Sequence, residues 1–152
     1  MNKQDVVAVV LGGPSSEAEV SRRTGGAIAE ALREKGYNAV EVELVPEKLV
    51  EQLREIDAKV VFNAVHGMYG EDGRLQSILE AIKMPYTGSG VLASAVAMDK
   101  VATKRFLISA NISTPKCLMY NKRFDNDMAK IEKEIIATFG VPVVIKAADQ
   151  GS

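Results

Sequence analysis

The sequence has very little of the residues from which disulfide frameworks and metal centres are built. Its 152 residues include one cysteine, one histidine and no tryptophan. A single cysteine cannot form an internal disulfide, so a disulfide-stabilised domain is excluded and a reducing compartment is expected. One histidine without a partner histidine or cysteine is poor evidence for zinc. We expect Cys117 to be a small buried residue rather than a nucleophile, because no second histidine is present to activate it.

The sequence also lacks a dominant charge and a long apolar run. It has 19 basic and 20 acidic residues and a net charge of -1, so no basic field points to nucleic acid. The longest apolar run, residues 91–98, is interrupted by Ser94 and is too short to cross a bilayer. No signal peptide is evident. We therefore expect a cytoplasmic protein that binds neither nucleic acid nor a membrane.

The apolar pattern that is present predicts an α/β fold with a parallel sheet. Strands and helices are expected to alternate along the first hundred residues, which is typical of parallel strands joined by helical crossovers. The expected strands are residues 6–11, about 39–45, 60–65 and a short strand from 85, and the expected helices are residues 16 to about 35, 46–54, 75–82, 91–97 and 101–108.

The first helix has recognisable start and stop signals. Ser16 and Glu19 have the spacing of a capping box, and Gly36 is placed to end the helix. The side chains expected to form its buried stripe are Val20, Ala27, Ile28, Ala31 and Leu32.

The pattern changes near residue 111 and indicates a second domain. Asp99 is expected to cap the helix that opens this domain, and further along we expect strands at 116–120 and 143–146 around a helix at 125–139. The last residues, 149–152, are expected to form a polar loop just after a strand of a new sheet. We therefore assign residues 1–100 to one domain and residues 101–152 to the first part of another.

Three glycine-containing loops are expected at the carboxyl edge of the first sheet. They span residues 12–17, 66–73 and 87–90. Ligands of open α/β sheets bind at this edge, so the loops predict a binding site. The pair Gly12-Gly13 opens the first loop, but neither a Walker A loop nor the dinucleotide fingerprint is present, and a simple tight turn is an equally good interpretation.

Several side chains near these loops are candidates for binding. Glu17 could hold a cationic amine or could simply complement the helix dipole. His66 could bind a carboxylate or move a proton, or could be hydrogen-bonded to a backbone group. Lys100, Lys104 and Lys146 could hold nucleotide phosphates or could be solvated. We assign Glu71 and Asp72 to a turn and helix entry rather than to a metal site.

Five collinear segments together resemble the D-alanine–D-alanine ligase family of the ATP-grasp superfamily. They are residues 11–21 (LGGPSSEAEVS), 66–76 (HGMYGEDGRLQ), 85–91 (PYTGSGV), 98–100 (MDK) with Lys104, and 142–146 (PVVIK) with Gly151 and Ser152. The resemblance implies a Rossmann-like, pre-ATP-grasp N-terminal domain followed by the start of an ATP-grasp domain.

The resemblance also implies a reaction and roles for individual residues. Members of this family join two D-alanines with ATP through an acyl phosphate, for peptidoglycan and hence cell-wall synthesis, and a cytoplasmic homodimer is expected. Glu17 would hold the ammonium of the first D-alanine, with Val20 and His66 beside that substrate. The implied ATP contacts are Lys100, Lys146, Gly151 and Ser152, and Ser152 would also hydrogen-bond Glu17.

The sequence departs from the family pattern in the last loop and leaves related functions open. Ala147 stands where many members have proline, and Asp149 puts an acid near the expected phosphates. The Mg²⁺ ligands and the residues for the second substrate would lie beyond residue 152, so this portion alone is expected to be inactive. A D-alanine–D-lactate or D-alanine–D-serine ligase, or a non-catalytic binding module, are the alternatives.

Overall fold

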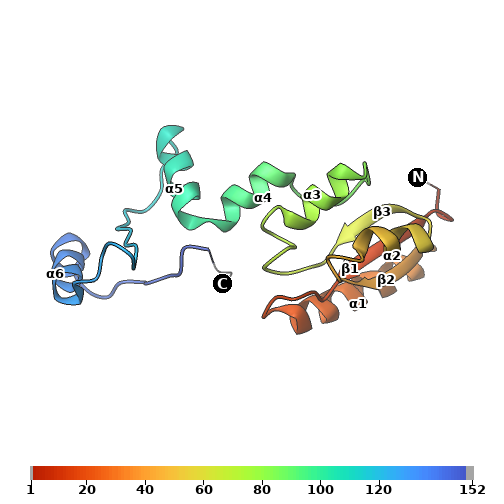
Figure 1. Ribbon diagram of the computed structural model, residues 1–152, viewed down its shortest axis with the longest axis horizontal. Coiled ribbons are helices and arrows are strands. Elements are labelled where there is room, and N and C mark those ends of the chain that lie inside the picture. Colours follow the sequence, from red (N-terminus) through yellow and green to blue (C-terminus); the bar gives the residue numbers. More distant parts are fainter. Residues whose placement is uncertain (1, 150–152) are drawn as a thin grey trace. The chain divides into compact units, whose positions relative to one another are not determined.

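The computed structural model describes residues 2–149 (Figure 1). These residues form two compact units that divide between Met98 and Asp99. We call residues 2–98 the sheet unit and residues 99–149 the helical unit, and each is described by itself.

The sheet unit is built on three parallel strands in the order β2-β1-β3. The strands are β1 (Val6–Leu11), β2 (Asn38–Glu43) and β3 (Ala58–Asn63). Val9 of the central strand lies opposite Glu41 on one side and Phe62 on the other. The expected strand near residue 86 is a single parallel bridge between Val61 and Tyr86. The predicted α/β class with a parallel sheet is therefore confirmed.

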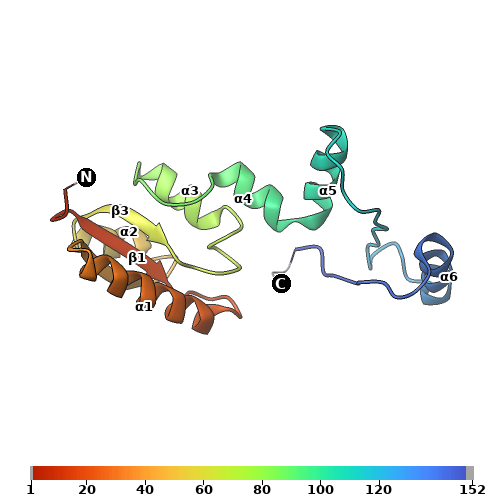
Figure 2. The ribbon, with the colours of Figure 1, turned by 180° about the vertical axis from the view of Figure 1, so that it is seen from behind.

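Helices pack on both faces of this sheet (Figures 1 and 2), and each face has its own apolar cluster. Alternate residues of β1 point to opposite faces, as the period of a strand requires. The sheet unit contains the helices α1 (Ala18–Glu34), α2 (Leu49–Glu55), α3 (Arg74–Ala81) and α4 (Val91–Met98). Val7 and Val9 pack with Ala29 of α1, whereas Ala8 and Val10 belong to the cluster that contains Leu49 and Leu53 of α2 and Leu75 and Leu79 of α3.

The start of α1 differs from the predicted capping box. Glu17, not Ser16, precedes the helix, and it makes no side-chain capping hydrogen bond. Glu19 instead lies 3.6 Å from the guanidinium of Arg22. The loop turns more tightly than the pattern implied, because the Ala18 N–H donates to the Ser15 carbonyl at 3.2 Å.

The buried stripe of α1 was predicted only in part: Ile28 and Leu32 are partly buried against the sheet, whereas Val20, Ala27 and Ala31 are exposed. Its buried residues are Ser21, Gly25 and Ala29, whereas Val20 is 52% exposed. A Cβ at Gly25 would lie 2.6 Å from the Leu11 side chain. Small residues form the stripe because the helix lies very close to β1, and the larger apolar residues flank that contact.

Other boundaries in the sheet unit shift by a few residues. β3 begins and ends two residues earlier than predicted, and Pro46 lies in a turn before α2. Gly36 has a φ of +79° directly after the Lys35 C-cap, so the predicted helix stop is confirmed.

The helical unit contains α5 (Lys100–Ser109) and α6 (Met128–Phe139). Asp99 caps α5 by accepting hydrogen bonds from the N–H groups of Val101 and Ala102, as predicted. Asp127 caps α6, so this helix begins three residues later than expected.

The strands expected at 116–120 and 143–146 are not formed in the described residues. A strand needs a neighbour for its backbone hydrogen bonds, and residues 99–149 include none. Val144 and Ile145 are 81% and 83% exposed. Cys117 is exposed as well, so its predicted burial is wrong.

Among the described residues, no helix combines the length and apolar character that a membrane span requires.

Candidate functional site

The loop after β1 is shaped by two glycines in left-handed conformations. Gly12 and Gly13 have φ values of +71° and +88°. A Cβ at Gly12 would overlap the carboxylate of Glu43. The Gly13 N–H donates to Glu43 Oε1 at 3.2 Å. The glycine pair therefore suits the left-handed turn in which this loop approaches the end of β2.

The loop after β3 is held by side-chain bonds to its own backbone. Asn63 and Gln76 each donate to the Gly70 carbonyl at 2.7 Å. Asp72 accepts hydrogen bonds from the N–H groups of Tyr69 and Arg74. These contacts fix the turn and the entry into α3, which is the structural role expected for Asp72. The sequence analysis assigned no loop-stabilising role to Asn63 or Gln76, because their side-chain amides carry no distinctive pattern.

Two serines join the two loops. The Ser21 hydroxyl donates to the Ala64 carbonyl at 2.7 Å and accepts from the Gly12 N–H at 2.8 Å. The Ser15 hydroxyl donates to the His66 carbonyl at 2.9 Å. The loops that follow β1 and β3 therefore form one connected structure.

Glu17 lies at the junction of these loops. A Cβ on Gly67 would be 3.5 Å from Glu17 Oε1, so the carboxylate faces the second loop. Glu17 is half-buried, and among residues 2–149 its carboxylate has neither a hydrogen-bond nor an ion-pair partner. An unpaired carboxylate in such a position is able to accept an ammonium group.

His66 is oriented by side chains rather than by the backbone group considered from the sequence. Its Nε2 lies 3.3 Å from Thr24 Oγ1 on α1, and its Nδ1 lies 3.8 Å from Glu71 Oε1. Val20, one turn into α1, is half-exposed on the same unit. The structure thus places Glu17 and His66 in the two loops that Ser15 joins, and Val20 in the first turn of the helix that follows Glu17.

An exposed ion pair supports the first loop from the side of β2. Arg22 donates from Nη2 to Glu43 Oε1 at 2.7 Å and from Nε to Glu43 Oε2 at 3.1 Å. The hydrogen bonding and charge of Arg22, helped by the Gly13 N–H, hold the pKa of Glu43 below its ordinary value, although partial burial opposes this.

The predicted phosphate-binding lysines lie in the helical unit. The Lys100 N–H donates to the Ala148 carbonyl at 2.8 Å, so the segment that follows Lys146 returns to the start of α5. Lys146 is exposed. Lys104 donates to Thr114 Oγ1 at 2.8 Å and to the Pro115 carbonyl, which gives it a structural role. Gly151 and Ser152 lie outside the described residues.

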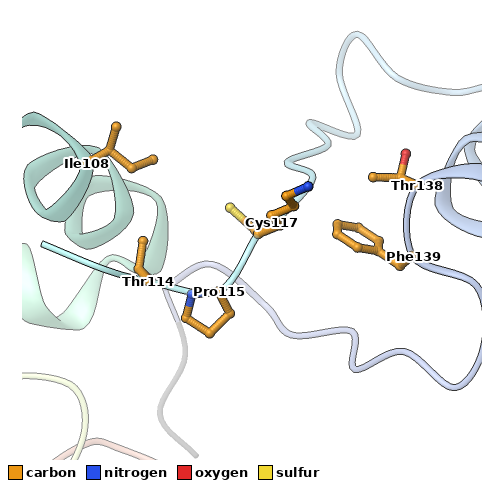
Figure 3. A pocket seen from close by; sticks show the side chains of 7 residues that line it. Ile108, Thr114, Pro115, Cys117, Thr138 and Phe139 are labelled. Atoms are coloured by element: carbon orange, nitrogen blue, oxygen red, sulfur yellow. The ribbon is translucent and has the colours of Figure 1, made fainter. Parts of the chain in front are cut away.

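The helical unit also has an open apolar hollow of about 390 Å³ (Figure 3). It lies between the end of α5 and the end of α6, and Figure 3 shows Cys117 between Ile108 and Phe139. None of the sequence-predicted site residues lines it. The described residues contain no group of three or more histidine, cysteine or acidic side chains placed to hold a metal ion.

Comparisons with known proteins agree on one family. A family model described as D-ala D-ala ligase N-terminus matches residues 43–89. The chain is 47% identical over 147 residues to the D-alanine–D-alanine ligase of Moorella thermoacetica and 44% identical over 146 residues to that of Carboxydothermus hydrogenoformans. Each alignment covers 96% of this chain but 47% and 46% of the relative, so the chain spans about half the length of these curated relatives.

Solved structures lead to the same family. The fold matches a D-alanine–D-alanine ligase from Bacillus anthracis with a TM-score of 0.82 and 34% identity, over 97% of this chain and 47% of the other. The same enzyme complexed with ATP matches with a TM-score of 0.81 and 33% identity, over 96% of this chain and 48% of the other. The chain belongs to the D-alanine–D-alanine ligase family, whose N-terminal portion it matches.

Proposed function

We propose that the complete protein containing this chain joins two D-alanines with ATP to make a peptidoglycan precursor. The observation that carries the proposal is the Glu17 carboxylate, which is unpaired among residues 2–149 and lies where the loops after β1 and β3 meet. The names of the relatives support the substrate, and the ATP complex of the Bacillus anthracis enzyme supports the nucleotide.

The sheet unit would bind the first D-alanine. This substrate is a small zwitterion, so it needs an anion for its ammonium group and a polar partner for its carboxylate. Glu17 supplies the anion, and His66 is held in the adjoining loop by Thr24 and Glu71. Val20 would lie beside the substrate methyl group. A fixed distance between Glu17 and His66 would orient the carboxylate of the substrate for reaction.

The helical unit would contact ATP through Lys100 and Lys146. Transfer of the γ-phosphoryl group to a carboxylate oxygen of the first D-alanine gives an acyl phosphate and ADP. The amine of the second D-alanine, in its neutral form, then attacks the acyl carbon. Phosphate leaves with the carboxylate oxygen that had accepted the phosphoryl group, and the nitrogen loses a proton as the peptide bond forms. Two lysines of one unit would offset the phosphate charge during the first step.

Other parts of the proposal concern groups outside the described residues. Ser152 would hydrogen-bond Glu17, and Gly151 and Ser152 would help order the loop over the phosphates. Mg²⁺ would neutralise phosphate charge, with ligands supplied from beyond residue 152. A cytoplasmic homodimer would be the working form.

The proposal is tested by D-alanine-dependent phosphate release from ATP by the complete protein. We expect release with D-alanine and none above background with L-alanine, together with a dipeptide product. Product formation only when D-lactate or D-serine is added would instead indicate a related ligase. If no phosphate is released with D-alanine alone, with D-alanine and D-lactate, or with D-alanine and D-serine, the result would contradict the proposal and favour a non-catalytic binding module.

A further inference from the structure

Ser21 joins the ends of two neighbouring strands. It is fully buried, and its hydroxyl donates to the Ala64 carbonyl and accepts from the Gly12 N–H. Gly12 and Ala64 are the residues that directly follow β1 and β3. The Ala64 N–H also donates to the Val10 carbonyl at 2.9 Å, which extends the pairing of the strands to this point. Ser21 therefore fixes the separation of the two chains where the sheet ends.

Ser15 makes a second connection between the same two loops, farther from the sheet than Ser21. Its hydroxyl donates to the His66 carbonyl at 2.9 Å and accepts from the Glu17 N–H at 3.2 Å. One oxygen atom is thus bonded to the backbones of both residues proposed to bind the first D-alanine. A hydroxyl is suited to this position because it donates and accepts at once, whereas alanine does neither.

We infer that Ser15 and Ser21 are positioning residues that fix Glu17 relative to His66, an inference that rests on the proposed function. The two serines bridge the same pair of loops at successive distances from the sheet. If both bridges are present, the separation of the ammonium-binding and carboxylate-binding groups is set before substrate arrives, and substrate binding does not have to order the loops.

The test is the steady-state kinetics of the complete protein with Ser15→Ala. We expect the KM for the first D-alanine to rise about three- to tenfold, the factor that corresponds to one lost hydrogen bond, with the KM for ATP unchanged. Ser16→Ala is the matched control, because Ser16 is exposed in the same loop and has no hydrogen-bond partner among the described residues. It should leave both constants unchanged.

A double substitution separates positioning from general loosening of the fold. In a Glu17→Gln background, Ser15→Ala should change the KM for D-alanine less than twofold, because the group that Ser15 positions has already lost its charge. Ser21→Ala should raise the same KM and also lower the Tm, since it leaves two buried backbone groups unpaired. If that variant does not fold, Ser15→Ala still decides the question.

The outcomes distinguish this inference from the proposed function. Wild-type activity with an unchanged D-alanine KM in Ser15→Ala would overturn the positioning role and leave the ligase proposal standing. An equal rise in the KM for D-alanine and for ATP would also overturn it. Absence of D-alanine-dependent phosphate release in the wild-type protein would instead overturn the proposed function.

Discussion

Glu43 connects three parts of the sheet unit through one carboxylate. It lies at the end of β2, accepts two hydrogen bonds from Arg22 of α1 and accepts another from the Gly13 N–H of the first loop. Because these donors favour the ionised form, the pKa of Glu43 lies below its ordinary value of 4.5. The ion pair is exposed, so its effect on stability is modest and sensitive to salt.

The lowered pKa predicts a pH dependence of stability. A carboxylate with a depressed folded-state pKa contributes its full stabilisation above the ordinary value of 4.5, and this is lost as the pH falls through the folded-state pKa. Glu43→Gln should therefore be less stable than wild type at neutral pH, and the difference should shrink below pH 4.5. Urea unfolding across this range measures it.

Glu30→Gln is the control for this prediction. Glu30 is exposed on α1 and has no ion pair among the described residues. The difference in stability between Glu30→Gln and wild type should therefore not change as the pH falls below neutral. A Glu43→Gln difference that grows as the pH falls below 4.5 would contradict the assignment.

Two glycines of the sheet unit give a second prediction about the effect of single residues on stability. A Cβ at Gly70 would overlap the Val65 carbonyl, whereas a Cβ at Gly26, in the interior of α1, would meet nothing within 4 Å. Gly70→Ala should destabilise the protein by about 1–3 kcal/mol, because the backbone has to move. Gly26→Ala should stabilise it by up to about 1 kcal/mol through helix propensity. Chemical denaturation measures both, and a neutral Gly70→Ala would contradict the packing.

Single residues differ in how well the sequence revealed them. Glu17 was predicted to bind an ammonium group because it is a carboxylate without a capping role that follows a glycine pair after a strand, and this role stays a prediction. Ser21 was not predicted to have a role, because a serine inside a helix gives no signal until the strand ends on either side of its hydroxyl are known. Its two partners are 9 and 43 residues away in the sequence.

Among the elements, α3 was predicted from its apolar spacing and forms one side of the core. Leu75 and Leu79 lie one turn apart and are both fully buried. They belong to the cluster on the face of the sheet that includes Ala8 and Val10. This helix follows the His66 loop directly, so its packing also anchors the candidate site.

Removing a buried side chain of α3 should destabilise the sheet unit strongly. Leu79→Ala should cost about 2–5 kcal/mol, because it combines lost burial with a cavity. Leu92→Ala is the control on the adjoining helix α4, since Leu92 is 73% exposed and its truncation should change stability by less than about 0.5 kcal/mol. Equal effects on the urea midpoint would contradict the assigned packing.

Elements whose structure depends on distant partners were predicted less well. Residues 116–120 and 143–146 have strand-like composition but form no strand within residues 2–149, because no other strand lies beside them there. The stripe of α1 was predicted only in part, because the contact with β1 selects small residues, which a hydrophobicity pattern does not favour. Local spacing thus located the helices but not every buried face.

At the scale of the whole molecule, the two units differ in how much they bury. The buried apolar core lies within residues 7–79, and no residue of 99–149 is buried. Phe124 and Met128 are 73% and 71% exposed. The sheet unit therefore holds most of the hydrophobic stabilisation of the described chain.

Limited proteolysis of the 152-residue chain should reflect this difference. Trypsin should cut first at Lys116, Lys122 or Arg123, which lie in the segment between α5 and α6 that has neither helix nor strand. A fragment containing the sheet unit should persist, as intact-mass measurement would show. Earlier cleavage between residues 6 and 98 would contradict the assignment of stability to that unit.

The most direct test of the account compares Glu17→Gln with Glu19→Gln in the complete protein. Removing the Glu17 charge should raise the KM for the first D-alanine about 10- to 100-fold, since a charged hydrogen bond is lost, and should leave the KM for ATP within about twofold. Glu19 is an exposed acid two residues away and should show neither effect. Equal changes in both constants for Glu17→Gln, or an unchanged KM for D-alanine, would contradict the central claim that Glu17 binds the substrate ammonium.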